Sequence, residues 1–329
     1  MTNKSPRVSF VIPVRNGAAD LPRCLRSIAA NRHAAVEVEI LVVDNGSSDD
    51  SAGIARRAGA QVIDRPGLRV GACRNAGAAA SRGDVVAFID ADNEIASGWL
   101  HACVKAFQQQ ELGVAGYPYH APVNATWVQQ MYDALRVKAA DRRDVEWLGA
   151  GNLAVRRTVF EQIGGFDESL EACEDVQLCH AVRHAGYRVV SQPGMDSVHH
   201  GDPRTLSALF FGELWRGRDN LRVSLRGPLT IRTVPSALLP VMGLGCMSLL
   251  TLGLLASPWV GGRAAALGAL GLVTIAALKA VVIIVRGRMT NPLAWAQGFV
   301  VAGTYETARA LSLVSAATHR TRVRVARPA

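Results

Sequence analysis

Short apolar runs alternate with helix-like segments over the first ninety residues. Four of these runs are typical of buried strands, at residues 8–13, 38–43, 61–63 and 85–89. Between the first two runs, Leu21, Leu25 and Ile28 recur at the spacing of one helix face. Strands that alternate with helices favour right-handed crossovers and parallel pairing. We therefore expect an α/β fold with a mostly parallel sheet flanked by helices.

The last third of the chain has a different pattern. Residues 234–256 carry no charge, and residues 264–285 carry only Lys279. Each run is long enough to cross a hydrocarbon layer of about 30 Å. Arginines flank the pair on both outer sides, and positive residues tend to stay in the cytoplasm. We expect a transmembrane helical hairpin with a short loop at residues 257–263; a buried hairpin of a soluble protein is the alternative.

Residues 293–315 are apolar but are interrupted by Gln297, Glu306 and Arg309, and an arginine-rich tail follows at residues 320–327. A third span would carry this tail out of the cytoplasm, against the tendency of positive charge. We therefore expect an interfacial or re-entrant helix, with the tail on anionic headgroups.

These patterns divide the chain into a catalytic or binding domain at residues 1–226 and a membrane region at residues 227–329. The N-terminus has no apolar signal-peptide core, so we expect a cytoplasmic domain at the inner (plasma) membrane. The six cysteines show no zinc-type spacing. The net charge is +9, and we expect a basic membrane-proximal surface to be its cause. Since aromatic residues are few and no nucleic-acid module is present, we expect no nucleic-acid partner.

Asp90 and Asp92 follow the apolar run that ends at residue 89. Because side chains alternate along a strand, both carboxylates point the same way. They repel each other unless a cation lies between them, and hard oxygen ligands favour Mg2+ or Mn2+. Most isolated Asp-x-Asp triplets are solvated surface acids. The position of this pair at a strand end is what favours a metal site.

Three upstream segments carry polar residues where ligands of parallel sheets bind, beyond the carboxyl ends of the strands. The loop at residues 13–17 can hold a base or a phosphate, and an ordinary turn is the alternative. The loop at residues 44–50 begins with Asp44, which could accept from an imide N–H such as that of uracil; an Asx turn is the alternative. In residues 71–77, glycines allow close approach of a helix, and Arg74 could contact a phosphate.

The order of these segments resembles glycosyltransferase family 2, which has the GT-A fold. The matching blocks are Pro-x-Arg-Asn, Asp-Asn-Gly-Ser-x-Asp, Gly-x-x-Arg-Asn-x-Gly and Asp-x-Asp, each in its expected order. Gly151-Asn152, Glu174-Asp175 and a histidine some two dozen positions later also match. The resemblance covers about residues 7–226 and says nothing of the exact sugar.

The resemblance implies the roles of the acidic pair and of its neighbours. Asp175 would be the catalytic base, and Glu174 would support it or contact the acceptor. Acids that favour the dipole at a helix start are the alternative for this pair. The expected acceptor residues are Trp147, Gly151 and Asn152. Core packing and turn geometry explain Trp147 and Asn152 nearly as well.

The resemblance also implies a metal site and a donor site. Asp92 would bind the cation directly, and Asp90 would contact either the cation or the ribose. His199 or His200 would approach the metal or the diphosphate, and the sequence does not choose between them. The expected donor-binding residues are Pro13, Arg15, Asn16, Asp44, Asn45, Gly71, Arg74, Asn75, Asp90 and Ala91.

From the resemblance we expect inverting transfer of one sugar from a nucleotide-sugar, a UDP-sugar by preference, to a lipid-linked or surface-polysaccharide acceptor. The chain lacks the Gln-x-x-Arg-Trp motif of processive synthases, so chain extrusion is not expected. A sugar nucleotidyltransferase is one alternative, but residues 13–17 do not supply its Gly-rich basic loop. A dehydrogenase would need Gly-x-Gly-x-x-Gly after the first strand, and residues 13–17 do not supply it. A non-catalytic membrane adaptor with this fold is the other alternative, and the intact acidic residues argue against it.

A cysteine introduced near residue 325 tests the location of the tail. If the tail is cytoplasmic, a membrane-impermeant thiol reagent should label this cysteine only after the cells are lysed. Strong labelling of intact cells would reject the predicted orientation.

Overall fold

The computed structural model describes residues 6–227, 230, 233–256 and 258–325, without the side chains of residues 258–260 and 317–325. The chain divides into two compact units. The first lies within Met1–Pro122 and Val137–Gly201, and the second within Val123–Arg136 and Asp202–Ala329. The end of the basic tail, at residues 326–329, and position 257 of the expected loop lie outside the described residues.

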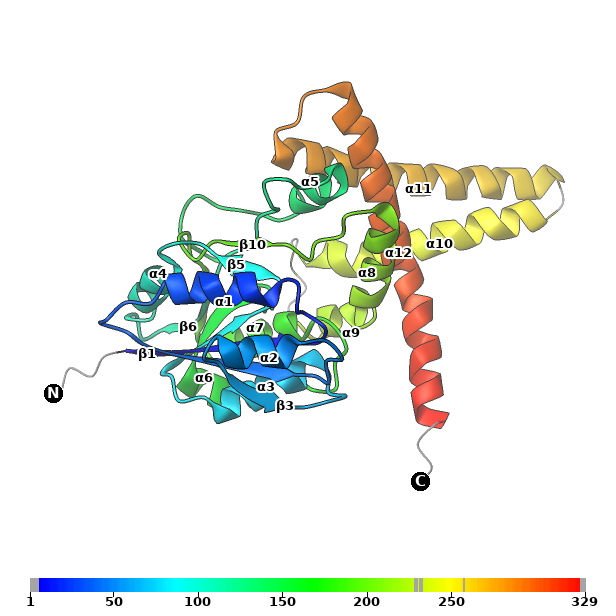
Figure 1. Ribbon diagram of the computed structural model, residues 1–329. Coiled ribbons are helices and arrows are strands. Elements are labelled where there is room, and N and C mark those ends of the chain that lie inside the picture. The colour runs from blue at the N-terminus through cyan, green and yellow to red at the C-terminus, as the bar shows by residue number, and fades with distance from the viewer. Residues whose placement is uncertain (1–5, 228–229, 231–232, 257, 326–329) are drawn as a thin grey trace. The chain divides into compact units, whose positions relative to one another are not determined.

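An eight-stranded mixed sheet forms the centre of the first unit, with helices on its faces (Figure 1). The strand order is β3-β2-β1-β4-β8-β6-β9-β7. The strands are β1 (Arg7–Val14), β2 (Glu37–Asp44), β3 (Gln61–Asp64), β4 (Val85–Ile89), β6 (Leu112–Gly116), β7 (Arg143–Asp144), β8 (Asn152–Arg156) and β9 (Arg188–Ser191). The first four strands pair in parallel, whereas β8 runs antiparallel to both β4 and β6. The expected α/β fold is confirmed, with its parallel part in the N-terminal half.

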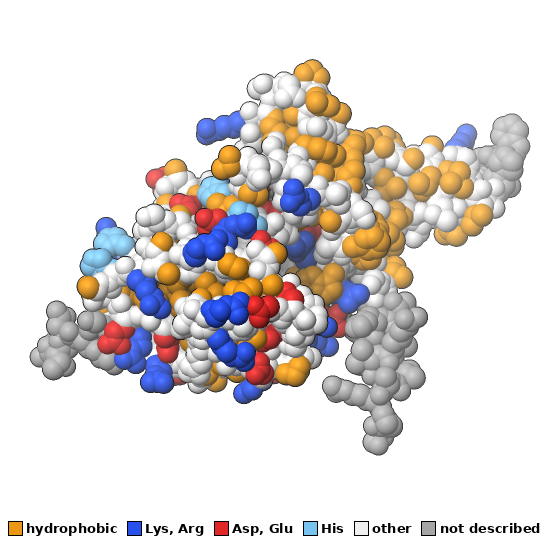
Figure 2. Space-filling model, in the orientation of Figure 1, with side chains coloured by type: hydrophobic (Ala, Val, Ile, Leu, Met, Phe, Trp, Pro, Cys, Tyr) orange, Lys and Arg blue, Asp and Glu red, His pale blue; other side chains and the backbone are white. Residues whose placement is uncertain are grey.

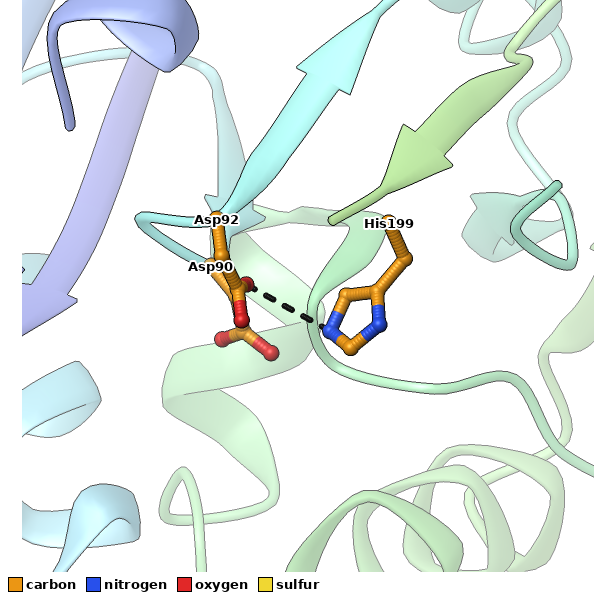
Figure 3. Close-up of side chains that lie close together, drawn as sticks. All are labelled: Asp90, Asp92 and His199. Atoms are coloured by element: carbon orange, nitrogen blue, oxygen red, sulfur yellow. Dashed lines mark ion pairs between the residues drawn. The ribbon is translucent and has the colours of Figure 1, made fainter. Parts of the chain in front are cut away.

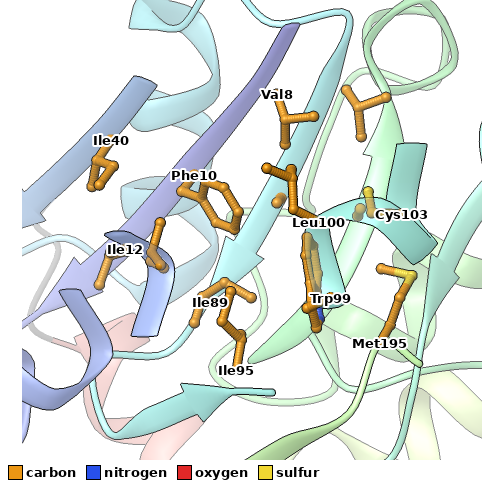
Figure 4. Packing of buried hydrophobic residues seen from close by; sticks show 14 of the residues in the cluster. Val8, Phe10, Ile12, Ile40, Ile89, Ile95, Trp99, Leu100, Cys103 and Met195 are labelled. Carbon is orange, nitrogen blue, oxygen red and sulfur yellow. The ribbon is translucent and has the colours of Figure 1, made fainter. Parts of the chain in front are cut away.

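Both faces of the sheet are covered. Alternate residues of β1 point to opposite sides, and each set packs on its own face. Phe10 lies 5.5 Å from Trp99 between ring centroids, on the face shown in Figure 4. Val11 packs on the other face with Cys73 and Phe88. The helices of this unit are α1 (Leu21–Ala30), α2 (Ser51–Arg57), α3 (Val70–Ala80), α4 (Trp99–Ala106), α6 (Arg157–Gln162) and α7 (Glu174–His184). The apolar runs that form β1, β2 and β4 are therefore central strands covered on both faces, whereas the run at residues 61–63 forms the edge strand β3.

A two-stranded sheet links distant parts of the first unit. Its strands are β5 (Asn93–Ile95) and β10 (Ser197–His199), which pair antiparallel with His199 opposite Asn93. Because Asn93 follows Asp92 directly, this register brings the end of β10 to the Asp-x-Asp segment. The sequence gives no sign of this pairing, since both strands are only three residues long.

Helix α4 ends at Ala106. The guanidinium of Arg156 donates to the carbonyls of Phe107 and Gln109 at 2.9 and 2.7 Å, which gives these groups partners outside a helix. A long-range contact of this kind is invisible to helical periodicity.

The second unit is helical. It contains α5 (Trp127–Asp133), α8 (Leu206–Arg216), α9 (Asn220–Arg226), α10 (Val234–Leu255), α11 (Pro258–Gly287) and α12 (Pro292–Val325). Helix α5 stops at Asp133, and Arg136 beyond its end forms a two-pronged ion pair with Asp202 at 2.5 and 2.6 Å. Helix α11 already begins at Pro258, so the turn before it is shorter than the expected loop; proline is well tolerated in a first helical turn.

Within the described residues, two helices are long and apolar enough to cross a membrane. They are Val234–Leu255 and Gly261–Gly287, with mean hydropathies of 2.0 and 2.4. Only a minority of each apolar stretch is buried, 17% and 33%, unlike the core helix of a soluble protein. In Figure 2 apolar side chains dominate the surface of α10 and α11, whereas charged side chains gather on the first unit. By length and composition, the pair matches the hairpin expected from the sequence.

The charge inside the second apolar run is paired. Lys279 of α11 lies 2.8 Å from the carboxylate of Glu306 on α12, and its ammonium also lies 4.8 Å from the ring centre of Tyr305. An ionisable group inside a membrane helix almost always faces a partner of this kind. Helix α12 is continuous from residue 292 to residue 325, and its interfacial or re-entrant placement stays a prediction.

Candidate active site

Asp90, Asp92 and His199 converge at one point of the first unit (Figure 3). The two aspartates follow β4, and His199 ends β10. One ligand atom from each lies within 4.8 Å of the others, and His199 Nε2 lies 3.4 Å from Asp92 Oδ1. Two carboxylates and one imidazole form a donor set that suits Mn2+ or a similar divalent cation, with positions left for water or diphosphate oxygens. These residues therefore fit a divalent metal.

The two neighbouring histidines have different surroundings. His199 is buried and faces Asp92, whereas His200 Nε2 lies 3.0 Å from Glu94 Oε2. Adjacent side chains of an extended segment point to opposite sides, so only one of the pair can reach the Asp-x-Asp carboxylates. The structure thus distinguishes two residues that the sequence could not.

The guanidinium of Arg74 joins the Asp-x-Asp segment to the acidic pair on α7. Arg74 lies on α3 and is 3% exposed. One of its terminal nitrogens donates to Asp90 Oδ1 at 2.7 Å, and the other donates to Glu174 Oε1 at 2.6 Å. Both ends are therefore engaged by protein carboxylates, although the sequence led us to expect a phosphate contact. Charge-assisted bonds of this length fix the positions of both acids.

Asp175 begins α7 beside Glu174, after Cys173 in a left-handed conformation with φ 61°. Its Oδ1 accepts from the Val176 N–H at 2.8 Å, and its Oδ2 accepts from the Ala150 N–H at 3.4 Å. Burial and the negative charge of Glu174 raise the pKa of Asp175 to about 7, although the Val176 N–H and Arg74 oppose this shift. A carboxylate that titrates near neutrality is suited to accept a proton at physiological pH.

The loop at residues 149–152 contacts both acidic groups. Besides the bond from Ala150 to Asp175, the carbonyl of Gly151 accepts from the Asp90 backbone N–H at 3.1 Å and from the Asn93 side chain at 2.8 Å. A Cβ on Gly151 would collide with the Asp90 carboxylate, so glycine leaves room for this side chain. The loop, like Arg74, thus links the Asp-x-Asp segment to α7.

Asn152 is fully buried and does not line an open surface. Its carbonyl accepts from the Trp99 indole at 2.8 Å, and its amide donates to the carbonyls of Tyr117 and Met195 at 2.9 and 2.8 Å. These bonds match the packing alternative that the sequence left open. Trp147, in contrast, is 50% exposed.

The first two loops beyond the sheet are joined by hydrogen bonds. Asn16, in a left-handed conformation with φ 54°, accepts on its side chain from the Ser48 N–H at 2.8 Å. Its own N–H donates to Ser47 Oγ at 3.0 Å. Asp44 is buried, and its Oδ1 accepts from the Ser47 N–H at 2.9 Å. This local bond reaches three residues along the chain, one more than in an Asx turn, and it uses one carboxylate oxygen of Asp44.

Two further asparagines of the expected donor set hold loops in place. The Asn45 amide donates to the Leu68 carbonyl at 2.8 Å and accepts from the Leu68 N–H at 3.1 Å. The Asn75 amide makes the same pair of bonds to Phe166, at 3.0 and 2.9 Å. Arg15 is exposed at the end of β1. Among the remaining expected donor residues, Pro13 and Ala91 are half-buried and Gly71 is buried.

Tyr119 belongs to the same group of residues, and our sequence analysis missed it. Its ring stacks on His199 with 5.0 Å between ring centroids. It follows β6 in a short aromatic stretch, Tyr117-Pro118-Tyr119-His120, that carries no motif. Only the two aromatic residues so close together could have drawn attention to it.

The chain is similar to known glycosyltransferases. The family model described as Glycosyl transferase family 2 matches residues 9–164, which include Asp90 and Asp92 but end before α7. Glycosyltransferase AglE of Haloferax volcanii is 28% identical over 255 residues, covering 71% of this chain and 79% of that protein. The pre-mycofactocin glycosyltransferase of Mycobacterium tuberculosis is 29% identical over 201 residues, covering 56% of this chain. That match spans 41% of the mycobacterial protein, less than half of its length.

Solved structures with this fold include a mannosyltransferase and the protein TarS. The mannosyltransferase of Pyrobaculum calidifontis, determined with GDP-Man and Mn2+, is 17% identical with a TM-score of 0.55. It aligns over 93% of this chain and 88% of that one. TarS 1–349 of S. aureus has a TM-score of 0.51 at 15% identity, over 93% and 90% of the two chains. At these identities the two structures show the fold alone.

Replacing Arg74 tests the bridge between the two acidic groups. Arg74→Met leaves Glu174 buried without its cation, so the free energy of unfolding should fall by about 3–5 kcal/mol. The double variant Arg74→Met/Glu174→Gln removes the unpaired charge and should recover part of this loss. Urea denaturation of the single and double variants measures both values. A single variant as stable as the wild type, or a double variant that recovers nothing, would contradict the bridge.

Proposed function

The chain belongs to glycosyltransferase family 2, and from this premise we propose that it transfers one sugar from a nucleotide-sugar donor to an acceptor at the cytoplasmic face of the membrane. The observation that carries the proposal is the convergence of Asp90, Asp92 and His199, joined through Arg74 to Glu174 and the neighbouring Asp175. A cation group and a proton acceptor within one unit are what displacement of a nucleoside diphosphate by a hydroxyl requires.

The metal site serves the leaving group. We assign Asp92 and His199 to the cation, with Asp90 between the cation and Arg74. When bound, a divalent cation would neutralise the charge that develops on the departing diphosphate. Arg74 holds Asp90 from behind, and β5 and β10 hold His199 opposite Asn93. The positions of the ligands are therefore set by the fold before a cation binds.

The acidic pair serves the acceptor. In the proposed reaction, Asp175 takes the proton of the acceptor hydroxyl as its oxygen bonds to the anomeric carbon. The bond from that carbon to the diphosphate oxygen breaks in the same displacement, which inverts the configuration. Glu174 is turned towards Arg74, so we assign it a supporting role instead of an acceptor contact.

The donor base is assigned to the first two loops. Asp44 keeps one carboxylate oxygen beyond the bond from Ser47, and that oxygen is the proposed acceptor for the imide N–H of uracil. Arg15 is exposed and available for the nucleotide. Because Asn16 and Asn45 are used in holding the loops, we propose that they act on the donor by shaping its site.

The acceptor and the location are assigned from surface features of each unit. Trp147 is half exposed and follows Glu146 near α7, which suits a saccharide or lipid-linked saccharide. Helices α10 and α11 have the length and composition of membrane spans, which favours the inner membrane and an acceptor at its cytoplasmic leaflet. We retain the division into a cytosolic domain at residues 1–226 and a membrane region at residues 227–329.

Replacing the proposed base tests the activity. We expect the purified chain to release nucleoside diphosphate from one or more of a panel of UDP- and GDP-sugars, only when Mn2+ or Mg2+ is added. Asp175→Asn should lower turnover by about 10²–10⁴-fold, the contribution of a positioned base, with little change in Mn2+ affinity. Asp64→Asn, at an exposed carboxylate in β3, is the matched control and should keep full turnover. Near-normal turnover in Asp175→Asn would remove it as the base, and no release from any donor would favour the adaptor alternative.

The raised pKa of Asp175 predicts a pH dependence. Only the ionised carboxylate can accept the proton, so activity should fall as the pH drops through about 7. The measurement is kcat/KM for the donor between pH 5 and 9, at Mn2+ concentrations shown to be saturating at each pH. A profile that stays flat down to pH 5 would show that the base has an unperturbed pKa, because an ordinary carboxyl titrates at about 4.

A further inference from the structure

We propose that Tyr119 is a positioning residue. Its ring orients the imidazole of His199, and its hydroxyl holds the loop at residues 149–152 in place. This inference rests on the proposed function, because it concerns the same candidate metal and base. It adds a residue outside every motif in the sequence, and it assigns separate tasks to two parts of one side chain.

The ring of Tyr119 controls the plane of the His199 imidazole. The two rings stack at 5.0 Å between centroids, with 25° between their planes. The backbones are tied as well, since the His199 N–H donates to the His120 carbonyl at 2.9 Å and the His120 N–H donates to the Ser197 carbonyl at 2.8 Å. His199 Nε2 lies 3.4 Å from Asp92 in this orientation. A ring held between a stack and a carboxylate does not have to be ordered when a cation binds.

The hydroxyl of Tyr119 holds the glycine loop. It accepts from the Gly151 N–H at 3.1 Å. A Cβ on Gly151 would lie 2.8 Å from this hydroxyl, and a Cβ on Gly149 would collide with it. Both glycines therefore make room for Tyr119. The residue between them, Ala150, directs its N–H to Asp175, so the hydroxyl acts on the proposed base through the loop.

These two contacts can be separated by substitution. Tyr119→Phe keeps the ring against His199 and removes the acceptor of the Gly151 N–H. Tyr119→Leu removes both contacts but keeps an apolar side chain. The matched control is Tyr117→Phe, because the Tyr117 hydroxyl donates to the Ala139 carbonyl at 2.8 Å and touches neither acidic group.

The first measurement is the affinity of the purified chain for Mn2+ alone, by titration calorimetry. Tyr119→Leu should bind Mn2+ about tenfold more weakly than the wild type, the lower end of the loss seen when a residue that orients a ligand is removed. The Mn2+ affinities of Tyr119→Phe and Tyr117→Phe should stay within about twofold of the wild-type value, because neither change alters the stacking on His199. If Tyr119→Leu does not fold by circular dichroism, Tyr119→Met takes its place. Unchanged Mn2+ affinity in the ring-removing variant would overturn the role of the ring.

The second measurement is turnover of the donor at saturating Mn2+. Tyr119→Phe should lower kcat about tenfold with the donor KM unchanged, as expected when the loop that orients the base is loosened. Tyr117→Phe should match the wild type, which distinguishes this effect from the general loss of a tyrosine hydroxyl. A wild-type kcat in Tyr119→Phe, or a tenfold loss of Mn2+ affinity in that variant, would overturn the division of tasks.

His199→Ala separates this inference from the proposed function. If His199→Ala binds Mn2+ as tightly as the wild type, the assigned metal site is wrong and so is the task assigned to the ring. If His199→Ala weakens binding but Tyr119→Leu does not, the metal site stands and Tyr119 has no part in it. Loss of affinity in both variants supports the inference, even in a chain that turns over no donor of the panel.

Discussion

The ion pairs of Arg74 with Asp90 and Glu174 are the interaction on which the candidate site depends. Carboxylates from β4 and α7 would repel each other if no cation lay between them. Because Arg74 is buried, water screens these charges little, and the guanidinium fixes both acids at once. Burial and the charge of Glu174 raise the pKa of Asp175, which has no direct bond to Arg74 among the described contacts, although Arg74 opposes this shift. One buried arginine thus holds the candidate metal ligand Asp90 and Glu174, the neighbour of the candidate base, in fixed positions.

Around Arg74 and its two carboxylates, most polar residues of the site hold the backbone of neighbouring segments in place. Asn16, Asn45, Asn75 and Asn152 each use the side-chain amide on a neighbouring segment. An amide has both a donor and an acceptor, so one side chain can join two loops that lack secondary structure. The strand ends therefore carry loops with defined positions, as a preorganised site requires.

The pattern of apolar and polar residues determined much of this protein. Runs with valine and isoleucine predicted the central strands, because strands covered on both faces must be apolar at every position. The ordered motifs predicted the residues that meet at the ends of β1, β2 and β4. The two apolar runs near the C-terminus predicted α10 and α11. Each of these features is local, and the chemistry of a short segment is enough to define it.

Tertiary structure decided what depends on contacts between distant segments. Register placed His199 at the Asp-x-Asp segment and His200 at Glu94, a choice that two adjacent histidines cannot reveal. Folding also turned Arg74 towards carboxylates and brought Tyr119 to His199, residues 80 positions apart in the printed sequence. The physical reason is that a side chain's partner is set by the packing of whole elements, whereas periodicity and motifs describe only neighbours along the chain.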